Sequence, residues 1–160
     1  MPPITALLHT KNDGLRLGRA LETLLPCSEI LIVDHQSSDQ TTRVARRYGA
    51  RVVPADDRAA GDYSASARYD WILCLDPSES LTEALQATLF EWSFASTAEA
   101  SGTSAFSFFV REQVGELWRV REITETRLIP RNWGVWNGHF PAHEPSARTL
   151  EGELLRLAFP

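Results

Sequence analysis

The chain has 160 residues, of which 43% are hydrophobic, so it is long enough to form one domain with a sizeable core. Its formal net charge of −5 argues against a general nucleic-acid-binding surface, which needs an excess of positive charge. No apolar run approaches the roughly 18 residues of a transmembrane helix, and the start of the chain lacks the features of a signal peptide. We therefore expect a cytoplasmic protein, peripheral at most to the inner face of the membrane.

The first part of the chain alternates between strand-like and helix-like segments. Short apolar runs predict strands over residues 4–9, 30–33, 51–53 and 71–75. Periodic apolar positions and capping signals predict helices over residues 15–25, 41–48 and 63–68, and a fourth from Ser80 or Thr82 to Trp92. Asp13 is expected to cap the first helix, and Ser80 with Glu83 forms a possible capping box. This alternation implies right-handed crossovers and a parallel sheet.

The pattern changes after Ala95. Residues 96–104 predict a loop of small residues, residues 105–110 and 114–120 a hairpin, and residues 126–130 and 154–159 two more strands. We predict a single domain over residues 1–160, with an α/β half at 1–95 and a smaller β-rich half at 96–160.

Two of the predicted strands end on an acid. Asp34 follows one strand and leads into a polar loop with Ser37 and Asp39, and Asp76 follows another. Ligands of open α/β sheets bind outside the carboxyl ends of the strands, and a carboxylate can accept hydrogen bonds from a base or a ribose. The two acids therefore predict a nucleotide site. In the alternative interpretation, each acid only caps the turn that follows its strand.

Three segments carry a family resemblance. They read Ile4-Thr-Ala-Leu-Leu-His-Thr-Lys-Asn12, Glu29-Ile-Leu-Ile-Val-Asp-His-Gln-Ser-Ser-Asp-Gln-Thr41 and Asp70-Trp-Ile-Leu-Cys-Leu-Asp-Pro-Ser-Glu79. In this order and spacing they resemble glycosyltransferase family 2, in particular the subgroup related to lipopolysaccharide-core glucosyltransferases. The resemblance implies a GT-A-like, Rossmann-like α/β fold, with a mostly parallel sheet flanked by helices. Residues 1–95 would then be the nucleotide-binding half, and residues 96–160 the acceptor side.

The resemblance also implies a nucleotide site and its ligands. The donor would be a nucleotide sugar, with a UDP-sugar favoured, and no nucleic acid is expected as a partner. Asp34 would accept a hydrogen bond from the base, and Asp76 matches the first acid of the family's DXD motif, near the ribose and the metal. The nucleotide-binding residues implied in this way are Thr10, Asn12, Asp34, Ser37, Asp39 and Asp76.

The implied cofactor is Mg²⁺ or Mn²⁺, held by Asp76, because a diphosphate needs a cation. Here the motif reads Asp76-Pro-Ser78, so a serine replaces the usual second metal-binding acid. A hydroxyl is a much weaker ligand for a hard ion than a carboxylate, although Glu79 lies next to it and is a candidate substitute. Metal dependence is therefore in question for this chain.

A base is needed to deprotonate the acceptor hydroxyl in an inverting transfer. The pair His143-Glu144 is similar to a His-Glu pair of the family, and we predict one of the two as this base. A surface loop between two prolines is the alternative. Arg127 and Arg131 are predicted either to contact the diphosphate or, as the favoured interpretation, to lie on the surface.

The predicted function is that of an inverting hexosyltransferase in cell-envelope glycan synthesis, which moves a sugar from a nucleotide-diphosphate donor to a hydroxyl of a glycan or lipid-linked acceptor. One alternative is a weak or inactive relative that acts as a nucleotide-sugar-binding or regulatory module. Another is a different nucleotide-using enzyme, such as a nucleotidyltransferase. The sequence Lys11-Asn-Asp-Gly14 is a poor version of the Gly-rich basic loop that such an enzyme needs.

Overall fold

The computed structural model describes residues 3–94 and 105–158. The predicted loop at 96–104 and the last predicted residue of the final strand, Phe159, lie outside the described residues. The helices are α1 (Leu17–Glu22), α2 (Thr41–Arg47), α3 (Ala60–Ala65) and α4 (Glu83–Phe94). The strands are β1 (Ile4–Thr10), β2 (Glu29–Asp34), β3 (Arg51–Pro54), β4 (Trp71–Cys74), β5 (Glu79–Leu81), β6 (Phe106–Val114), β7 (Leu117–Val120), β8 (Glu125–Pro130), β9 (Trp136–Asn137), β10 (Phe140–Pro141) and β11 (Arg148–Arg156).

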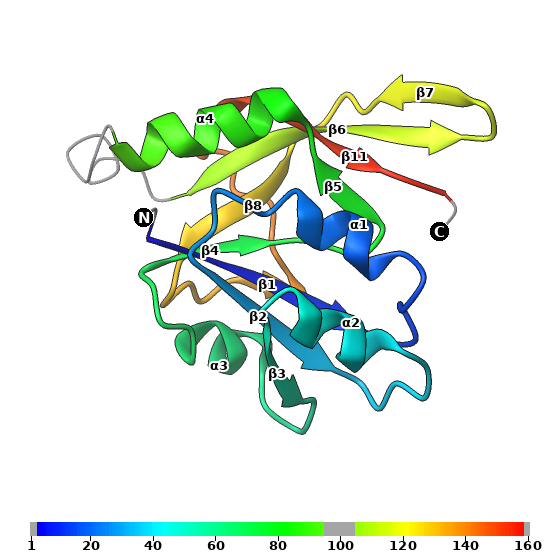
Figure 1. The fold of residues 1–160 in the computed structure, drawn as a ribbon. Coiled ribbons are helices and arrows are strands. Elements are labelled where there is room, and N and C mark those ends of the chain that lie inside the picture. Colours follow the sequence, from blue (N-terminus) through cyan, green and yellow to red (C-terminus); the bar gives the residue numbers. More distant parts are fainter. Residues whose placement is uncertain (1–2, 95–104, 159–160) are drawn as a thin grey trace.

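One large sheet organises the molecule (Figure 1). Its strand order is β3-β2-β1-β4-β8-β6-β11-β5, with β7 paired to β6. Strands β1 to β4 are parallel, as the alternation of elements predicts, whereas β8 joins antiparallel to β4 and β6 antiparallel to β8. Strands β9 and β10 form a separate small ribbon. The predicted α/β fold, in which helices flank the sheet, is confirmed, and strands β1 to β4 form the predicted parallel part of that sheet.

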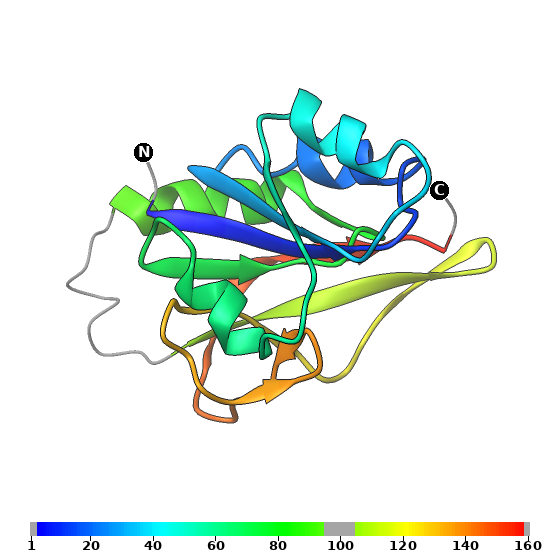
Figure 2. The ribbon, with the colours of Figure 1, turned by 90° about the horizontal axis from the view of Figure 1, so that it is seen from below.

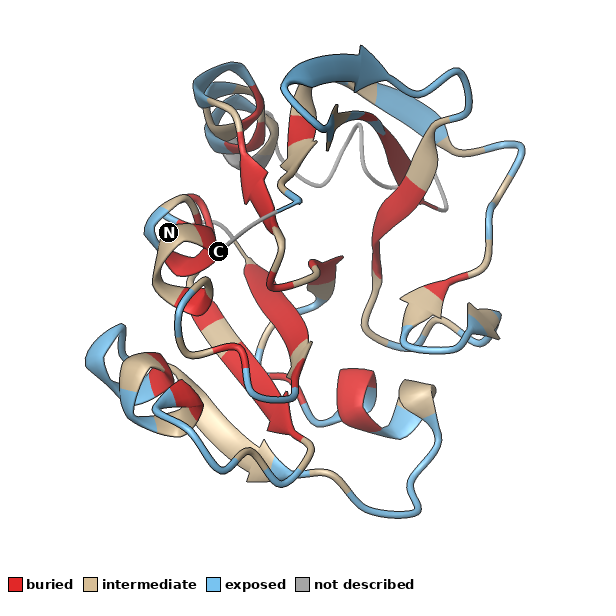
Figure 3. Ribbon diagram, turned by 90° about the vertical axis from the view of Figure 1, so that its right-hand side faces the viewer, coloured by how far each residue is buried: buried red, intermediate tan, exposed pale blue. Residues whose placement is uncertain are grey.

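Helices cover both faces of the sheet, with α1, α2 and α4 on one side and α3 and the β9–β10 ribbon on the other (Figure 2). Alternate residues of β1 point to opposite faces of the sheet. Leu8 packs with Leu17 of α1 and Leu85 of α4 in one cluster, whereas Leu7 packs with Tyr63 of α3 in the other. Strands buried on both faces explain the nearly continuous apolar runs in the sequence. The central strands and the first half of β6 are buried, whereas β7 and the end of β6 that pairs with it are largely exposed (Figure 3).

The first helix differs from its prediction. It spans only Leu17–Glu22, and Leu15 and Leu25 are 88% and 68% exposed, so they do not belong to its buried face. Asp13 does not cap it through its side chain. The Asp13 carboxylate accepts hydrogen bonds from the backbone N–H of Lys11 and from the side chain of Arg16, while its carbonyl accepts the N–H of Leu17. The leucine spacing matched a helix, but residues 14–16 form a turn in which Leu15 is exposed to solvent.

The start of α4 also differs from its prediction. Ser80 lies in strand β5, so the predicted capping box of Ser80 and Glu83 is wrong. Thr82 takes the capping role instead, since its hydroxyl accepts the N–H of Leu85 at 3.2 Å. Strand β5 is only three residues long and pairs with β11, which lies far along the sequence. A local pattern cannot report such a distant partner.

The hairpin and the final strand are displaced from their predicted ranges. Strand β6 continues to Val114, and the turn contains Gly115, whose φ of +62° suits glycine. Strand β11 spans Arg148–Arg156, where the sequence predicted residues 154–159. The first half of β11 is mostly polar and largely exposed, so it contains no apolar run from which a strand could be predicted.

A buried ion network joins β5, β8 and β11. Arg127 is 1% exposed and Glu79 is fully buried, and the two form a bidentate pair with N–O distances of 2.7 and 2.9 Å. Arg127 also donates to Glu125, and Arg156 donates to both acids. Burial acts to lower the pKa of Arg127, but the two carboxylates raise it above its usual value. Both predicted roles of Arg127, surface residue and diphosphate ligand, are therefore wrong.

No helix within residues 3–94 and 105–158 has the length and apolar character needed to cross a membrane. The longest, α4, has 12 residues.

Candidate functional site

The candidate site lies where the carboxyl ends of β1, β2 and β4 meet. These three strands are adjacent and parallel, with Thr10 of β1 in register with Asp34 of β2. The backbone N–H of His35 donates to the carbonyl of Thr10 at 2.8 Å, which continues the pairing by one residue beyond β2. The three loops that follow these strands therefore start from one edge of the sheet, as expected for a ligand site in an α/β fold.

Asp34 is held at this edge by three hydrogen bonds. Its Oδ1 accepts the hydroxyls of Thr10 at 2.7 Å and Ser37 at 2.6 Å, and its Oδ2 accepts the N–H of Ser37 at 3.0 Å. Burial acts to raise the pKa of this carboxyl, but the hydrogen bonds from Ser37 and Thr10 outweigh it and keep the pKa below its usual value. Asp34 is therefore an ionised acceptor with a fixed orientation, and one oxygen still has spare capacity.

The loops after β1 and β2 are tied to each other. Asn12, with φ of +53°, donates its N–H to the Ser37 hydroxyl and accepts the N–H of Ser38 on its side-chain oxygen. Asp39 accepts the N–H groups of Gly14 and Thr41. Four of the predicted nucleotide-binding residues, Thr10, Asn12, Asp34 and Ser37, thus form one hydrogen-bonded unit, and Asp39 links the same two loops through Gly14. Asn12 and Asp39 use their side chains to hold the loops together.

Asp76 lies just beyond β4, on the far side of β1 from Asp34. Its Oδ2 accepts the N–H of Ser78 at 2.9 Å and the Ser78 hydroxyl at 2.5 Å. The backbone N–H of Asp76 donates to the carboxylate of Glu79 at 2.8 Å. Asp76 also lines a small cavity together with His9 and His139, so it faces the same edge as the loops after β1.

The loop that follows β4 offers a hard divalent ion only part of the ligand set that it needs. Ser78 directs its hydroxyl hydrogen toward Asp76, and Glu79 is fully buried in the ion network with Arg127. Glu79 therefore cannot act as the substitute ligand that its position in the sequence suggested. One carboxylate, that of Asp76, is left to contact an ion, and Mg²⁺ can bind through one carboxylate when substrate phosphates and water complete its shell.

His143 and Glu144 lie in the loop after β10. His143 is exposed, and the Glu144 carboxylate accepts the N–H and the hydroxyl of Ser146, which lower the pKa of Glu144. The N–H of Glu144 donates to Thr126 of β8. Among the described residues, neither side chain forms a hydrogen bond or ion pair with Asp34 or Asp76, so the structure does not join them to the nucleotide loops.

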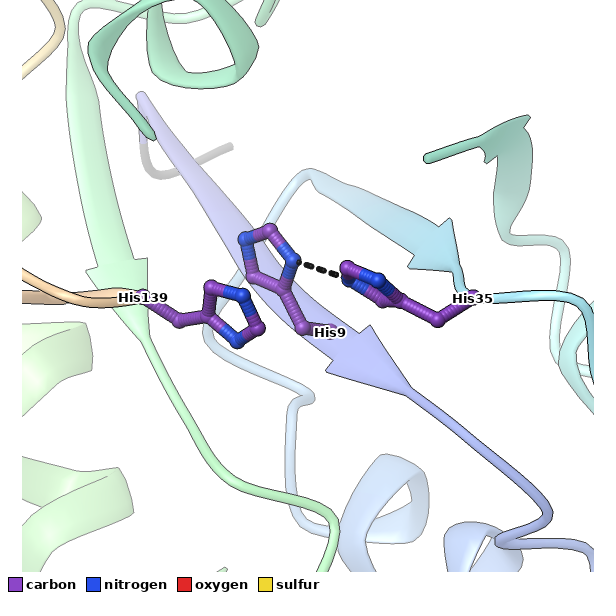
Figure 4. A group of neighbouring side chains, drawn as sticks. All are labelled: His9, His35 and His139. Carbon is purple, nitrogen blue, oxygen red and sulfur yellow. Dashed lines mark hydrogen bonds between the residues drawn. The ribbon is translucent and has the colours of Figure 1, made fainter. Parts of the chain in front are cut away.

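The sequence analysis missed a histidine cluster at the same edge. His9 is on β1, His35 directly follows β2, and His139 is in the turn between β9 and β10 (Figure 4). The three rings form a triangle. Nδ1 of His9 is 2.9 Å from Nε2 of His35, and the ring centroid of His139 is 3.8 Å from that of His9 and 5.0 Å from that of His35. The first pair could have been predicted, since His9 is the second-last residue of β1 and His35 directly follows the neighbouring parallel strand β2.

Known proteins with similar sequences are glycosyltransferases by name. An uncharacterised glycosyltransferase of Rickettsia felis is 33% identical over 101 residues, which are 60% of this chain and 35% of that protein. The 4,4′-diaponeurosporenoate glycosyltransferase of Staphylococcus aureus is 32% identical over 63 residues, which are 38% of this chain and 17% of that protein. No protein-family model matches. The chain spans about a third of the length of its Rickettsia relative.

Solved structures of glycosyltransferases share the fold. Glucosyl-3-phosphoglycerate synthase of Mycobacterium tuberculosis, in complex with Mn²⁺, UDP and glucosyl-3-phosphoglycerate, superposes with a TM-score of 0.51 at 20% identity, over 69% of this chain and 44% of that one. The TarS protein of S. aureus superposes with a TM-score of 0.55 at 16% identity, over 71% and 22%. The fold is that of the GT-A glycosyltransferases. In this GT-A fold, Asp34 and Asp76 occupy the carboxyl edge of the parallel strands.

Proposed function

We propose that this chain is the nucleotide-sugar-binding part of an inverting glycosyltransferase, which moves a hexose from a nucleotide-diphosphate donor to a hydroxyl of a glycan or lipid-linked acceptor. The observation that carries the proposal is the oriented, ionised carboxylate of Asp34, next to Asp76 at the carboxyl edge of a GT-A sheet. Structures of the same fold hold UDP-glucose and Mn²⁺, which supports UDP as the nucleotide.

In this proposal the nucleotide lies across the ends of β1, β2 and β4. Asp34 accepts a hydrogen bond from the base, because its two oxygens receive three hydrogen bonds from the protein and retain room for another. Thr10 and Ser37 keep that carboxylate in place, and Asn12 and Asp39 shape the loops around it. Asp76 lies closer to the ribose and the diphosphate.

A divalent ion, when bound, would neutralise the leaving diphosphate, with Asp76 as its protein ligand. The remaining ligands would come from the phosphates and water, so metal binding is expected to depend on the nucleotide. The acceptor hydroxyl then attacks the anomeric carbon, and Glu144 or His143 takes its proton. Glu144 can accept this proton as a carboxylate, but the hydrogen bonds from Ser146 lower its pKa and make it a weaker base, so the acceptor would have to displace Ser146 to reach it.

Asp34→Asn tests the nucleotide site. The variant is expected to raise the Kd for UDP by about 10- to 100-fold, because a hydrogen bond to a charged group contributes about 1.5–3 kcal/mol. Calorimetric titration with UDP and UDP-glucose, each with and without Mn²⁺, measures the change. Asp70→Asn is the matched control, since Asp70 precedes β4 at the opposite edge of the sheet and is exposed. Equal affinity in wild type and Asp34→Asn would reject the site.

Ser78→Asp tests whether the loop of Asp76 contributes to a metal site. A second carboxylate beside Asp76 is expected to tighten Mn²⁺-dependent UDP binding roughly tenfold, or about 1.4 kcal/mol. Ser78→Asn has a similar shape without the charge and should not produce the gain. The measurement is the ratio of UDP affinities with and without Mn²⁺ in the three proteins. An unchanged ratio in Ser78→Asp would show that the loop does not contribute to a metal site.

A second function is a binding or regulatory module that holds a nucleotide sugar without transferring it. The arrangement of Ser78 and Glu79 favours this alternative, because it leaves Asp76 as the loop's available carboxylate. Donor turnover separates the two functions. Release of UDP from UDP-glucose in the presence of Mn²⁺, measured by a coupled assay, supports the transferase, whereas tight binding without release supports the module.

A further inference from the structure

Three histidines from distant parts of the sequence converge at the carboxyl edge of the sheet. His9 comes from β1, His35 from the residue after β2, and His139 from the β9–β10 turn (Figure 4). The chain has four histidines in all, so three of them gather here while His143 lies elsewhere, exposed. The proposed nucleotide chemistry assigns none of these three side chains a role.

The spacing of the rings suits one metal ion. Each ring offers a nitrogen, and the three nitrogens lie within 4.8 Å of one another. A tetrahedral Zn²⁺ with bonds of about 2.0–2.1 Å keeps its ligand nitrogens roughly 3.4 Å apart. Nδ1 of His9 and Nε2 of His35 are already 2.9 Å apart, and Nε2 of His9 is unpartnered among the described residues, so either nitrogen of His9 is a candidate ligand. Small changes in the side-chain torsion angles would bring all three nitrogens to the bonding distance of one ion.

One of the two ring nitrogens of His9 lacks a hydrogen-bond partner among the described residues. Its Nδ1 pairs with His35, while its Nε2 is buried and has no hydrogen-bond partner among the described residues. A neutral imidazole nitrogen with a free lone pair is the form that binds metals, and the unpartnered Nε2 is placed to supply one.

We propose that His9, His35 and His139 form a binding site for a borderline-soft divalent transition-metal ion, with Zn²⁺ as the favoured occupant. Imidazole is a preferred ligand of Zn²⁺, Ni²⁺ and Cu²⁺, and a poor one for Mg²⁺. Three protein ligands leave a fourth position for water or a substrate atom, as in open zinc sites. The small cavity that His9 and His139 line together with Asp76 provides the space next to this position.

The site would join the two parts of the chain. Strand β1 and the residue that follows β2 supply two ligands, and the turn between β9 and β10 supplies the third, so the ion would fasten this turn to the strand ends. The proposal does not rest on the glycosyltransferase function, because it needs no nucleotide. It also differs from the ion proposed for Asp76, which is a hard ion bound through oxygen.

Calorimetric titration of the tag-free chain with Zn²⁺, in excess Mg²⁺ and without nucleotide, tests the site. Wild type is expected to bind one Zn²⁺ per chain with a Kd of about 1 µM or lower. His35→Gln and His139→Gln should each weaken binding at least about tenfold. His143→Gln is the matched control and should bind as wild type does. Co²⁺ in place of Zn²⁺ should give the visible absorption of a tetrahedral ion, and the two variants should lose it.

Circular dichroism and Tm values establish that the variants are folded, which is expected because His35 and His139 lie in loops. Absence of Zn²⁺ binding to the folded wild type would overturn the proposal. Zn²⁺ binding that persists unchanged in both His35→Gln and His139→Gln would also overturn it, since the ion would then be bound elsewhere. UDP affinity in the same variants reports on the nucleotide site separately.

Discussion

Replacing Arg127 by methionine is expected to lower the free energy of unfolding by about 3–5 kcal/mol, because it leaves a buried carboxylate without its main partner. Glu79 is fully buried, and Arg127 supplies two of its short hydrogen bonds. Arg156 would remain as a partner, but it holds only one Glu79 oxygen. Arg127 also donates to the carbonyl of Cys74 at the end of β4, so the substitution loosens the strand that precedes Asp76.

Urea unfolding followed by circular dichroism measures this loss, and the Tm should fall by roughly 10 °C. Arg111→Met is the matched control. Arg111 is also a strand arginine paired with a glutamate, Glu153, but it is exposed, so its loss should cost no more than about 1 kcal/mol. Adding Glu79→Gln to Arg127→Met should recover part of the stability, because it removes the unpaired charge. Equal small losses in both single variants would contradict the buried network.

Replacing Gly152 by alanine is expected to cost about 3 kcal/mol or more. Gly152 has a φ of +102°, which side-chain-bearing residues rarely adopt, and an added Cβ would lie 2.5 Å from the backbone N and Cα of Leu85. The residue lies where the β6–β11 pairing shifts register, and it lets β11 run directly over the start of α4. Because backbone atoms form the obstacle, a change of side-chain rotamer cannot relieve it.

Gly115→Ala separates the clash from the backbone strain. Gly115 has a φ of +62° in the β6–β7 turn, and an added Cβ there would meet no atom within 4 Å. This variant should lose only about 1–2 kcal/mol. The difference between the two free energies of unfolding, measured in urea, is the cost of the contact with Leu85. Similar losses in the free energy of unfolding for both variants would mean that β11 does not approach the Leu85 backbone of α4 as closely as the structure shows.

Local patterns in the sequence were sufficient to predict the positions of the first four strands. Strands β1 and β2 are buried on both faces, so their apolar runs and the polar residues that end them mark their limits. The parallel order follows from the helices between them, and it places Thr10 beside Asp34. This part of the candidate site could therefore be predicted, because it depends on neighbours in a regular sheet.

Other features depend on partners that are distant in sequence. Strand β5 has three residues and exists because β11 pairs with it, so Ser80 looked like the start of a helix. Arg127 looked like a surface arginine because only the folded sheet brings it to Glu79, 48 residues away. His139 joins His9 only through the position of the β9–β10 ribbon on the sheet. The spacing of residues that are close in the sequence cannot predict such contacts.

The pairing of β5 with β11 has a consequence for the order in which the chain can fold during synthesis. Strands β1 to β4 can pair as soon as their residues leave the ribosome, whereas β5 obtains its backbone partner only when β11 has been made. Thr82 and Glu153, which bond to each other where β5 leads into α4, are 71 residues apart. Loop closure over such a distance is slow compared with pairing of nearby elements. The edge that contains Asp34 can thus form early, while the Asp76 loop is anchored late, after most of the sheet is complete.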